Sequence, residues 1–253
     1  MRTNVRAFVQ LAAEALELRG PVYEFGSYQV DGQEHVADLR PLFAGQDYVG
    51  CDLRPGPGVD RLEDLAALSL SDDSASTIIC VETLEHVFEA RRGVEEMMRV
   101  LAPGGTLLVA APLDFRIHDY PGDYWRLTPS CLERLLAPLE ATLVGWQGVD
   151  RFPHTVFGIG CKAPARPNIA AGLNRFMEAY QQWLALSASE VPWPRRMKNW
   201  LSGIAGSKGD RRRDREYYQV RFAMELPAGR QRKHDLLGLS QADSGTGARL
   251  DLS

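Results

Sequence analysis

The stretch Ser76-Thr77-Ile78-Ile79-Cys80-Val81 is the most strand-prone run in the chain. It leads into residues 84–100, whose pattern is typical of a helix, and then into a turn at Pro103-Gly104-Gly105. A second apolar run, TLLVAA, follows at residues 106–111. Runs that are apolar at nearly every position are typical of strands buried on both faces of a sheet. The stretch therefore predicts two central parallel strands joined by a right-handed helical crossover.

The same alternation of strands and helices extends in both directions from this unit. We expect strands at residues 22–25, 46–53, 59–62, 141–149 and 155–162, and helices near the N-terminus, at 34–43 and at 130–139. The last helix has Thr128 or Ser130 as its cap and an early Pro129. Strands that alternate with helices at this spacing predict an α/β fold, Rossmann-like, with a mostly parallel sheet and helices on both faces.

The pattern changes at Pro164-Ala165-Arg166-Pro167, which we interpret as a domain boundary. We expect a first domain over residues 1–164, a helical, basic extension or lid over 165–234, and a disordered Gly/Ser/Asp-rich tail over 235–253.

The net charge of −4 over 253 residues is unevenly distributed. Residues 1–194 carry a net charge of −10, whereas residues 195–233 hold 12 basic and 4 acidic side chains. The sequence therefore predicts an acidic body with a basic segment attached.

No run approaches the roughly 18 apolar residues that a membrane span needs. The N-terminal stretch is amphipathic, and its Glu14, Glu17 and Arg19 do not suit a signal peptide. We therefore expect a cytoplasmic protein that does not interact with a membrane.

The four cysteines form no CxxC pair, so we expect them to be reduced and structural.

Small and acidic residues follow several of the predicted strands. Ligands of open α/β sheets bind at the carboxyl ends of the strands. Gly26, after the first strand, would let the backbone approach a ligand closely, and Asp52, after the second, would accept hydrogen bonds from both hydroxyls of a ribose. Asp64-Leu65 follows the next short apolar element, where an acid would accept from an adenine amino group while Leu65 packs on the ring. Each feature alone is also compatible with an ordinary turn or helix end.

Taken in order, these segments resemble the cofactor motifs of class I S-adenosylmethionine-dependent methyltransferases, in their type 11 branch. The resemblance rests on residues 22–27 (VYEFGS), 48–53 (YVGCDL), 64–65 (DL), 82–87 (ETLEHV) and 99–107 (RVLAPGGTL), and covers roughly residues 20–163. It implies a seven-stranded sheet whose last strand is antiparallel, with S-adenosylmethionine lying across the strand ends and S-adenosylhomocysteine as product. The cofactor-binding residues that it implies are Glu24, Phe25, Gly26, Ser27, Asp52, Leu53, Asp64, Leu65 and Glu82.

The sequence departs from the family pattern at two places. The glycine-rich loop is reduced to Gly26, with Tyr28 and Gln29 where small residues are usual. Thr77 stands where the family commonly has Asp.

Methyl transfer needs alignment of donor and acceptor and sometimes a base, so no fixed catalytic triad is expected. The candidate catalytic residues are His118, His86 and Glu85. The loop around His118 is rich in aromatic and titratable side chains, and an imidazole can take a hydroxyl proton at neutral pH. The alternative is that His118 caps local backbone while Asp123 and Arg126 pair to hold the loop.

The same residues leave a metal site open as a second interpretation, although we do not favour it from the sequence. Glu82, Glu85 and His86 form an ExxEH string, to which His118 would be added from the next strand end. Two carboxylates and two imidazoles would hold Mg²⁺, Mn²⁺ or Zn²⁺. A similar arrangement occurs in metal-dependent small-RNA 2′-O-methyltransferases of this family, whereas the Leu-Glu-His-Val string is also widespread in metal-free members.

The expected function is methyl transfer to a hydroxyl, or less readily an amine, of a small or saccharide-like acceptor. One alternative is an RNA or nucleic-acid methyltransferase that uses the basic segment 195–233, where Trp and Tyr are interleaved with Lys and Arg. Another is a catalytically silent protein of the same fold that binds the donor or a partner. The sequence is also compatible with a homo-oligomer.

Overall fold

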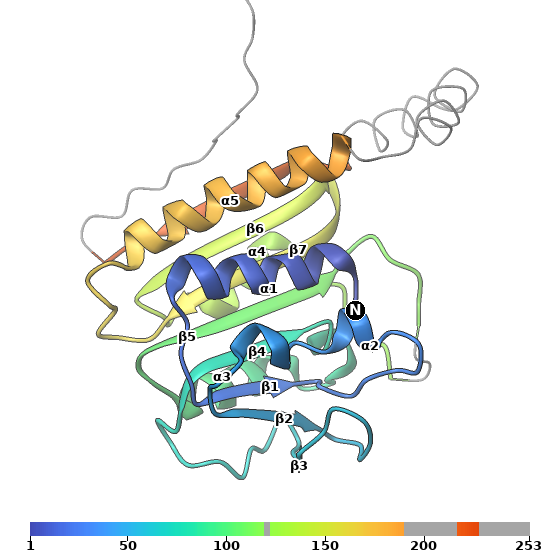
Figure 1. Ribbon diagram of the computed structural model, residues 1–253, viewed down its shortest axis with the longest axis vertical. Helices are drawn as coiled ribbons and strands as arrows, with labels where there is room; N and C mark the ends of the chain where they lie inside the picture. Colours follow the sequence, from blue (N-terminus) through green and yellow to red (C-terminus); the bar gives the residue numbers. More distant parts are fainter. Residues whose placement is uncertain (119–121, 190–216, 228–253) are drawn as a thin grey trace, which may run out of the picture.

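The computed structural model describes residues 1–118, 122–189 and 217–227. Within them, eight strands form one sheet in the order β3-β2-β1-β4-β5-β7-β6-β8 (Figure 1). The strands are β1 (Val22–Phe25), β2 (Tyr48–Asp52), β3 (Arg61–Leu62), β4 (Ala75–Val81), β5 (Leu101–Pro112), β6 (Ala141–Val149), β7 (Phe152–Cys161) and β8 (Val220–Glu225). The five strands from β3 to β5 are parallel, whereas β7 runs antiparallel to both of its neighbours.

Helices cover both faces of this sheet. They are α1 (Thr3–Leu16), α2 (Glu34–Ala37), α3 (Ala90–Val100), α4 (Pro129–Leu136) and α5 (Ile169–Ser189), with single 3₁₀ turns η1 (Arg40–Phe43) and η2 (Leu84–His86). The long helices α1 and α5 lie side by side on one face (Figure 1). They share an apolar cluster with β4, β5 and β7 that includes Phe8, Phe157 and Phe176. A second cluster lies under α3 and α4.

The central pair of strands has the structure that the sequence predicts. Residues 77–81 of β4 pair in parallel with residues 106–110 of β5, and the apolar side chains of both strands are buried. The chain reaches β4 from β3, on the far side of β1, so the strand order reverses between β1 and β4. In an open α/β sheet, such a reversal opens a crevice at the carboxyl ends of the two strands. The carboxyl ends of β1 and β4 are therefore the place to look for a ligand site.

The expected Rossmann-like fold is confirmed, with β7 as the antiparallel strand. The sheet has one strand more than the expected seven, because β8 pairs antiparallel with the outer edge of β6. Residues 165–234 thus contribute a strand as well as the expected helix α5. The expected helix over 84–100 is interrupted, since η2 ends at His86 and α3 begins at Ala90. Residues 195–216 and the tail 235–253 lie outside the described residues.

The expected cap of the helix after residue 128 is confirmed, and the structure also gives the surroundings of the four cysteines. Thr128 caps α4, because its hydroxyl accepts a hydrogen bond from the backbone N–H of Cys131 at 3.2 Å. All four cysteines are free, and three are buried, whereas Cys131 is exposed. Among the described helices, none combines the length and the apolar character that crossing a membrane requires.

Candidate functional site

Glu24 lies near the end of β1 and is almost completely buried. Its carboxyl group accepts a hydrogen bond from the hydroxyl of Tyr48 on the neighbouring strand β2. Burial raises the pKa of Glu24 to about 7, partly offset by the Tyr48 hydrogen bond and by the nearby Arg40 guanidinium. The same burial, with Glu24 beside it, raises the pKa of Tyr48 well above its ordinary value. This acid is therefore held close to its protonation midpoint at neutral pH.

The turn after β1 brings the backbone close to the end of β4. Gly26 has a positive φ of 87°, and a Cβ placed on it would lie 1.9 Å from the hydroxyl oxygen of Thr83. No side chain fits there, so the sequence needs glycine at this position. Thr83 donates to the carbonyl oxygens of Phe25 and Val81 at 3.1 and 3.0 Å, which joins the two strand ends. Beside this junction, the buried hydroxyl oxygen of Ser27 has no hydrogen-bond partner within the part of the chain that the structure describes.

Asp52 ends β2 next to this turn. Its two carboxylate oxygens face the backbone N–H groups of Arg54 at 3.0 Å and Tyr28 at 3.4 Å. The Asp52 side chain is only 12% exposed, whereas Leu53, the next residue, is 71% exposed. The structure thus brings the Asp52 carboxylate and an exposed apolar side chain together at one strand end.

Asp64 and Leu65 occupy different environments from each other. Asp64 is exposed and its carboxylate accepts from the backbone N–H of Ala66 at 2.9 Å. Leu65 is 7% exposed and packs in the apolar cluster beneath α3, close to Gly93. Asp64 is therefore available at the surface, while Leu65 contributes to the core.

Glu82 follows β4 in the left-handed region, with a φ of 51°. Its carboxylate is bound by Arg2, the residue just before α1: the Arg2 Nε lies 2.5 Å from one oxygen, and the Arg2 backbone N–H donates to the other at 3.0 Å. Arg2 also reaches β7, where it donates to the Thr155 hydroxyl and to the His154 carbonyl oxygen. Glu82 therefore ties the start of α1 to the carboxyl end of β4.

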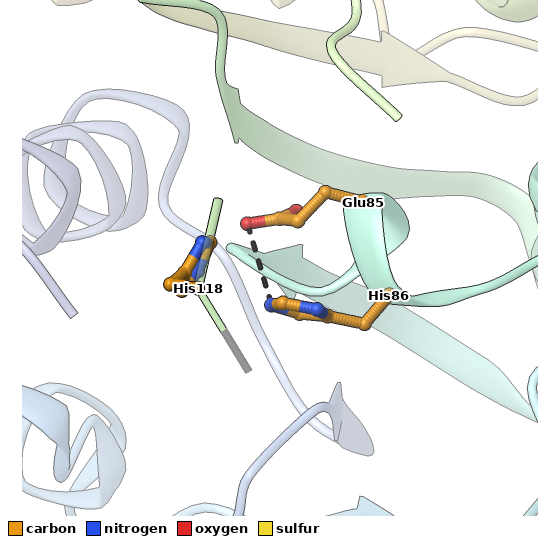
Figure 2. Close-up of side chains that lie close together, drawn as sticks. All are labelled: Glu85, His86 and His118. Atoms are coloured by element: carbon orange, nitrogen blue, oxygen red, sulfur yellow. Dashed lines mark ion pairs between the residues drawn. The ribbon is translucent and has the colours of Figure 1, made fainter. Parts of the chain in front are cut away.

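The three candidate catalytic residues converge at the end of β4. Glu85, His86 and His118 each offer a ligand atom, and these atoms all lie within 4.8 Å of one another (Figure 2). The rings of His86 and His118 meet edge to face at 4.8 Å between centroids, and the His86 Nε2 is 3.9 Å from a Glu85 oxygen. Glu85 and His86 belong to η2, whereas His118 comes from the connection between β5 and α4. Two segments about thirty residues apart thus form one cluster.

Both imidazoles are held by their Nδ1 atoms. The His86 Nδ1 lies 3.1 Å from the Gly122 carbonyl oxygen, and the His118 Nδ1 lies 3.1 Å from an Asp123 oxygen. A carbonyl oxygen or a carboxylate only accepts hydrogen bonds, so each Nδ1 carries its ring proton. In the neutral rings, the Nε2 atoms are then the acceptors.

Asp123 is itself fixed by two other groups. Both of its oxygens accept from the Arg126 guanidinium, at 2.5 and 2.7 Å, and one also accepts from the His118 backbone N–H at 2.8 Å. The Arg126 hydrogen bonds hold the pKa of Asp123 well below its ordinary value. The predicted Asp123–Arg126 pair therefore exists, and it orients His118 as well as holding the loop. Asp119 and Tyr120, other titratable side chains of this loop, lie outside the described residues.

Glu85 has no exposed surface, and neither of its carboxylate oxygens has a hydrogen-bond partner among the described residues. Burial raises the pKa of Glu85 to about 8, with the neighbouring Glu82 carboxylate acting in the same direction. An unpartnered buried carboxyl group is costly, and it is more often kept at functional sites than elsewhere.

Sequence reasoning missed Arg2 as part of this site. Arg2 belongs to no recognisable motif, and it reaches Glu82 only because α1 packs against the sheet. Phe88 was also missed, whereas Tyr124 and Trp125 belong to the aromatic-rich loop around His118 that the sequence singles out. These three side chains are 68%, 47% and 42% exposed. The backbone N–H groups of Tyr124 and Trp125 donate to the Glu85 carbonyl oxygen, which places the backbone of these two residues beside Glu85.

Comparison with known proteins supports the resemblance inferred from the motifs. Residues 35–109 match the family model of a methyltransferase domain. A probable S-adenosylmethionine-dependent methyltransferase from Mycolicibacterium smegmatis is 34% identical to the chain over 113 residues. That match covers 43% of this chain and 43% of the relative. The resemblance to S-adenosylmethionine-dependent methyltransferases is thus confirmed, over less than half of the relative's length.

Solved structures are similar at lower sequence identity. A possible histamine N-methyltransferase from Thermotoga maritima is 19% identical, with a TM-score of 0.44 over 62% of this chain and 91% of its own. A 1,6-didemethyltoxoflavin N1-methyltransferase from Burkholderia thailandensis, with bound S-adenosylhomocysteine, is 16% identical, with a TM-score of 0.47 over 63% of this chain and 78% of its own. At this distance, neither similarity establishes the activity or the acceptor of this chain.

Proposed function

We propose that the protein is an S-adenosylmethionine-dependent methyltransferase that acts on a hydroxyl group of a small or saccharide-like acceptor. The observation that carries the proposal is that two sets of side chains lie at the carboxyl ends of neighbouring parallel strands. One set lies at the ends of β1 and β2 and suits a nucleoside-containing donor. The other, the cluster of Glu85, His86 and His118 after β4, suits an acceptor that must lose a proton.

The donor set fits S-adenosylmethionine in its chemistry. Gly26 keeps the turn free of a side chain, and the Ser27 hydroxyl, which has no partner among the described residues, offers a buried hydrogen bond to a polar ligand group. The Asp52 carboxylate suits the two ribose hydroxyls, and the exposed Leu53 suits one face of an adenine ring. Asp64 lies at the surface, where it would accept from the adenine amino group. When bound, the donor supplies an electrophilic methyl group together with its own leaving group.

The acceptor set would position a hydroxyl and take up its proton. The Nε2 atoms of His86 and His118 are acceptors because their Nδ1 atoms are held by Gly122 and Asp123. A base held in this way contributes through proton transfer and through alignment of the attacking oxygen. Glu85 lies beside both rings as a third group able to exchange a proton.

The rim of the acceptor set favours a ring-shaped substrate. Phe88 packs edge to face on Tyr124 at 5.3 Å between centroids and lies 6.4 Å from Trp125. Exposed aromatic faces beside polar groups can pack on the apolar side of a sugar or another ring while its hydroxyls reach the polar groups. This supports a saccharide-like acceptor. The nucleic-acid alternative rests on residues 195–233, of which the structure describes only 217–227.

Calorimetry with S-adenosylhomocysteine and the variant Asp52→Ala tests the donor site. We expect the wild-type chain to bind, and the variant to bind at least tenfold more weakly, because the ribose loses a charged acceptor worth roughly 1.5–3 kcal/mol. The matched control is Asp47→Ala, an exposed acid just before β2 at the opposite end of that strand. Wild-type affinity in Asp52→Ala would contradict this placement of the ribose. An absence of binding by the wild-type chain would argue against both enzyme hypotheses and leave a catalytically silent protein that binds a partner.

A further inference from the structure

We propose that Glu85, His86 and His118 form a binding site for one divalent transition-metal ion of the Zn²⁺ class. Only the role of the ion depends on the proposed function. With an ion bound, the two Nε2 atoms would be ligands instead of bases, and the ion would act in their place by making a bound acceptor hydroxyl more acidic. Its binding depends on the geometry of the three side chains alone.

The three ligand atoms are almost close enough to share an ion. They lie within 4.8 Å of one another, and the pair formed by the Glu85 oxygen and the His86 Nε2 is separated by 3.9 Å. Around a tetrahedral Zn²⁺ with ligands at about 2.1 Å, neighbouring ligand atoms are about 3.4 Å apart. Small rotations of the side chains would therefore close the site around an ion. Figure 2 shows the three side chains facing a common space from η2 and from the segment that carries His118.

The contacts around the imidazoles are those of metal-binding histidines. A histidine ligand generally donates its second ring N–H to a carboxylate or a backbone carbonyl, which fixes the ring and its tautomer. His118 donates to Asp123 and His86 donates to the Gly122 carbonyl oxygen, so both kinds of partner are present. Asp123 is in turn held by two hydrogen bonds from Arg126. Both Nε2 atoms are thereby kept unprotonated in the neutral rings and available to an ion.

The burial of Glu85 is a second, independent observation that points to a bound cation. Its side chain is completely buried, and both oxygens lack a partner among the described residues. A buried carboxylate without hydrogen bonds is unfavourable unless it is paired with a cation or bound to a metal. The nearest imidazole nitrogen, the His86 Nε2, is too distant at 3.9 Å for a hydrogen bond. An ion between the three groups would satisfy this carboxylate.

The ligand set also indicates the class of ion. Two imidazoles and one carboxylate suit Zn²⁺ and related transition ions, whereas Mg²⁺ and Ca²⁺ prefer oxygen ligands. Three protein ligands leave at least one position for a water molecule or an acceptor oxygen. The fourth residue of the ExxEH-based set, Glu82, does not join them, because Arg2 binds its carboxylate. The structure therefore favours a three-ligand site with an open position.

The site can be tested by binding alone, without donor or acceptor. The full chain, free of any affinity tag, would be treated with a chelator, desalted and titrated by calorimetry with Zn²⁺, and separately with Co²⁺ while its visible absorption is recorded. We expect one ion per chain and the visible bands of a low-symmetry Co²⁺ complex. The variants Glu85→Gln and His118→Gln should each lose at least tenfold in affinity. Asp123→Asn should lose 10- to 100-fold, because an orienting partner of a ligand is weakened.

The matched control is His35→Gln, since this exposed histidine lies on α2, outside the cluster. It should bind as tightly as the wild-type chain. Glu85→Gln keeps the shape of the side chain and resembles the protonated acid that burial favours in the absence of an ion, so circular dichroism should show a folded protein. A wild-type chain that binds no ion, or a Glu85→Gln variant that binds as tightly as the wild type, would overturn the proposal. Binding of S-adenosylhomocysteine in the chelated protein tests the donor site separately.

Discussion

At the scale of single residues, Glu24 couples the proposed donor site to pH. Its pKa of about 7 in the folded chain compares with 4.5 for an ordinary glutamate, because the charged form is buried. Between these values the folded chain retains a proton that the unfolded chain has released, so the free energy of unfolding falls as pH rises. Its contribution to stability is complete below about pH 4.5 and is lost as pH rises through about 7.

The variant Glu24→Gln should remove this pH dependence. Its amide oxygen can still accept from Tyr48, but the side chain no longer titrates. As the pH rises from 4.5 to 8, we expect the free energy of unfolding of the variant to increase relative to that of the wild type by up to roughly 3 kcal/mol. Urea unfolding of both proteins across this range measures the difference. A constant difference in unfolding free energy at all pH values would contradict the raised pKa.

How much of the site was predictable also depends on individual residues. Asp52 ends β2, and Glu85 and His86 come a few residues after β4, so their places at the carboxyl ends of the strands could be inferred from the strand pattern. The approach of His118 to His86 required the fold of the connection after β5, and Arg2 required the packing of α1. The metal site was not favoured from the sequence because a string such as ExxEH does not show which carboxylate remains without a partner. Burial of Glu85 and the Arg2–Glu82 contact decide that choice.

At the scale of elements, the edge strand β8 was not predicted, whereas the helix before it was. Phe222 and Met224 are buried and alternate with the partly exposed Arg221, Ala223 and Glu225, but the sequence does not alternate between apolar and polar residues there, and we expected a helical, basic extension over residues 165–234. The pairing with β6 is a contact between segments about 80 residues apart, and local sequence patterns do not report such contacts. By contrast, the strand β4 and the crossover to β5 follow from local apolar runs and a turn.

The variant Phe222→Ala tests whether β8 is an integral part of the fold. Phe222 is 6% exposed and packs against Phe157, Phe176 and Tyr180 beneath α5. Truncation of a buried phenylalanine removes apolar contacts and leaves a cavity, so we expect a loss of about 3 kcal/mol in urea unfolding. The control is Leu62→Ala, whose side chain is 57% exposed and which should change stability by less than about 0.5 kcal/mol. Similar stability of the two variants would mean that β8 does not pack as described.

At the scale of the whole molecule, the described part of the chain has one sheet with an apolar cluster on each face. The proposed donor site lies at the ends of β1 and β2, whereas β8 lies at the opposite edge of the sheet, beyond β6 (Figure 1). A ligand that binds only the folded state stabilises the whole cooperative unit, even where a distant edge has been weakened. Donor binding and edge packing should therefore contribute independently, since distant sites without shared partners are additive.

Thermal unfolding with S-adenosylhomocysteine tests this independence. At a concentration 100 times the dissociation constant, the ligand should stabilise the wild-type chain by about 2.7 kcal/mol, which raises Tm by roughly 5–10 °C. Phe222→Ala should begin at a lower Tm and keep the full shift, because its donor site is unchanged. Asp52→Ala should begin near the wild-type Tm and lose most of the shift at the same ligand concentration. If Phe222→Ala also lost the shift, the edge strand would have to influence the donor site, and the two ends of the sheet would be coupled through its core.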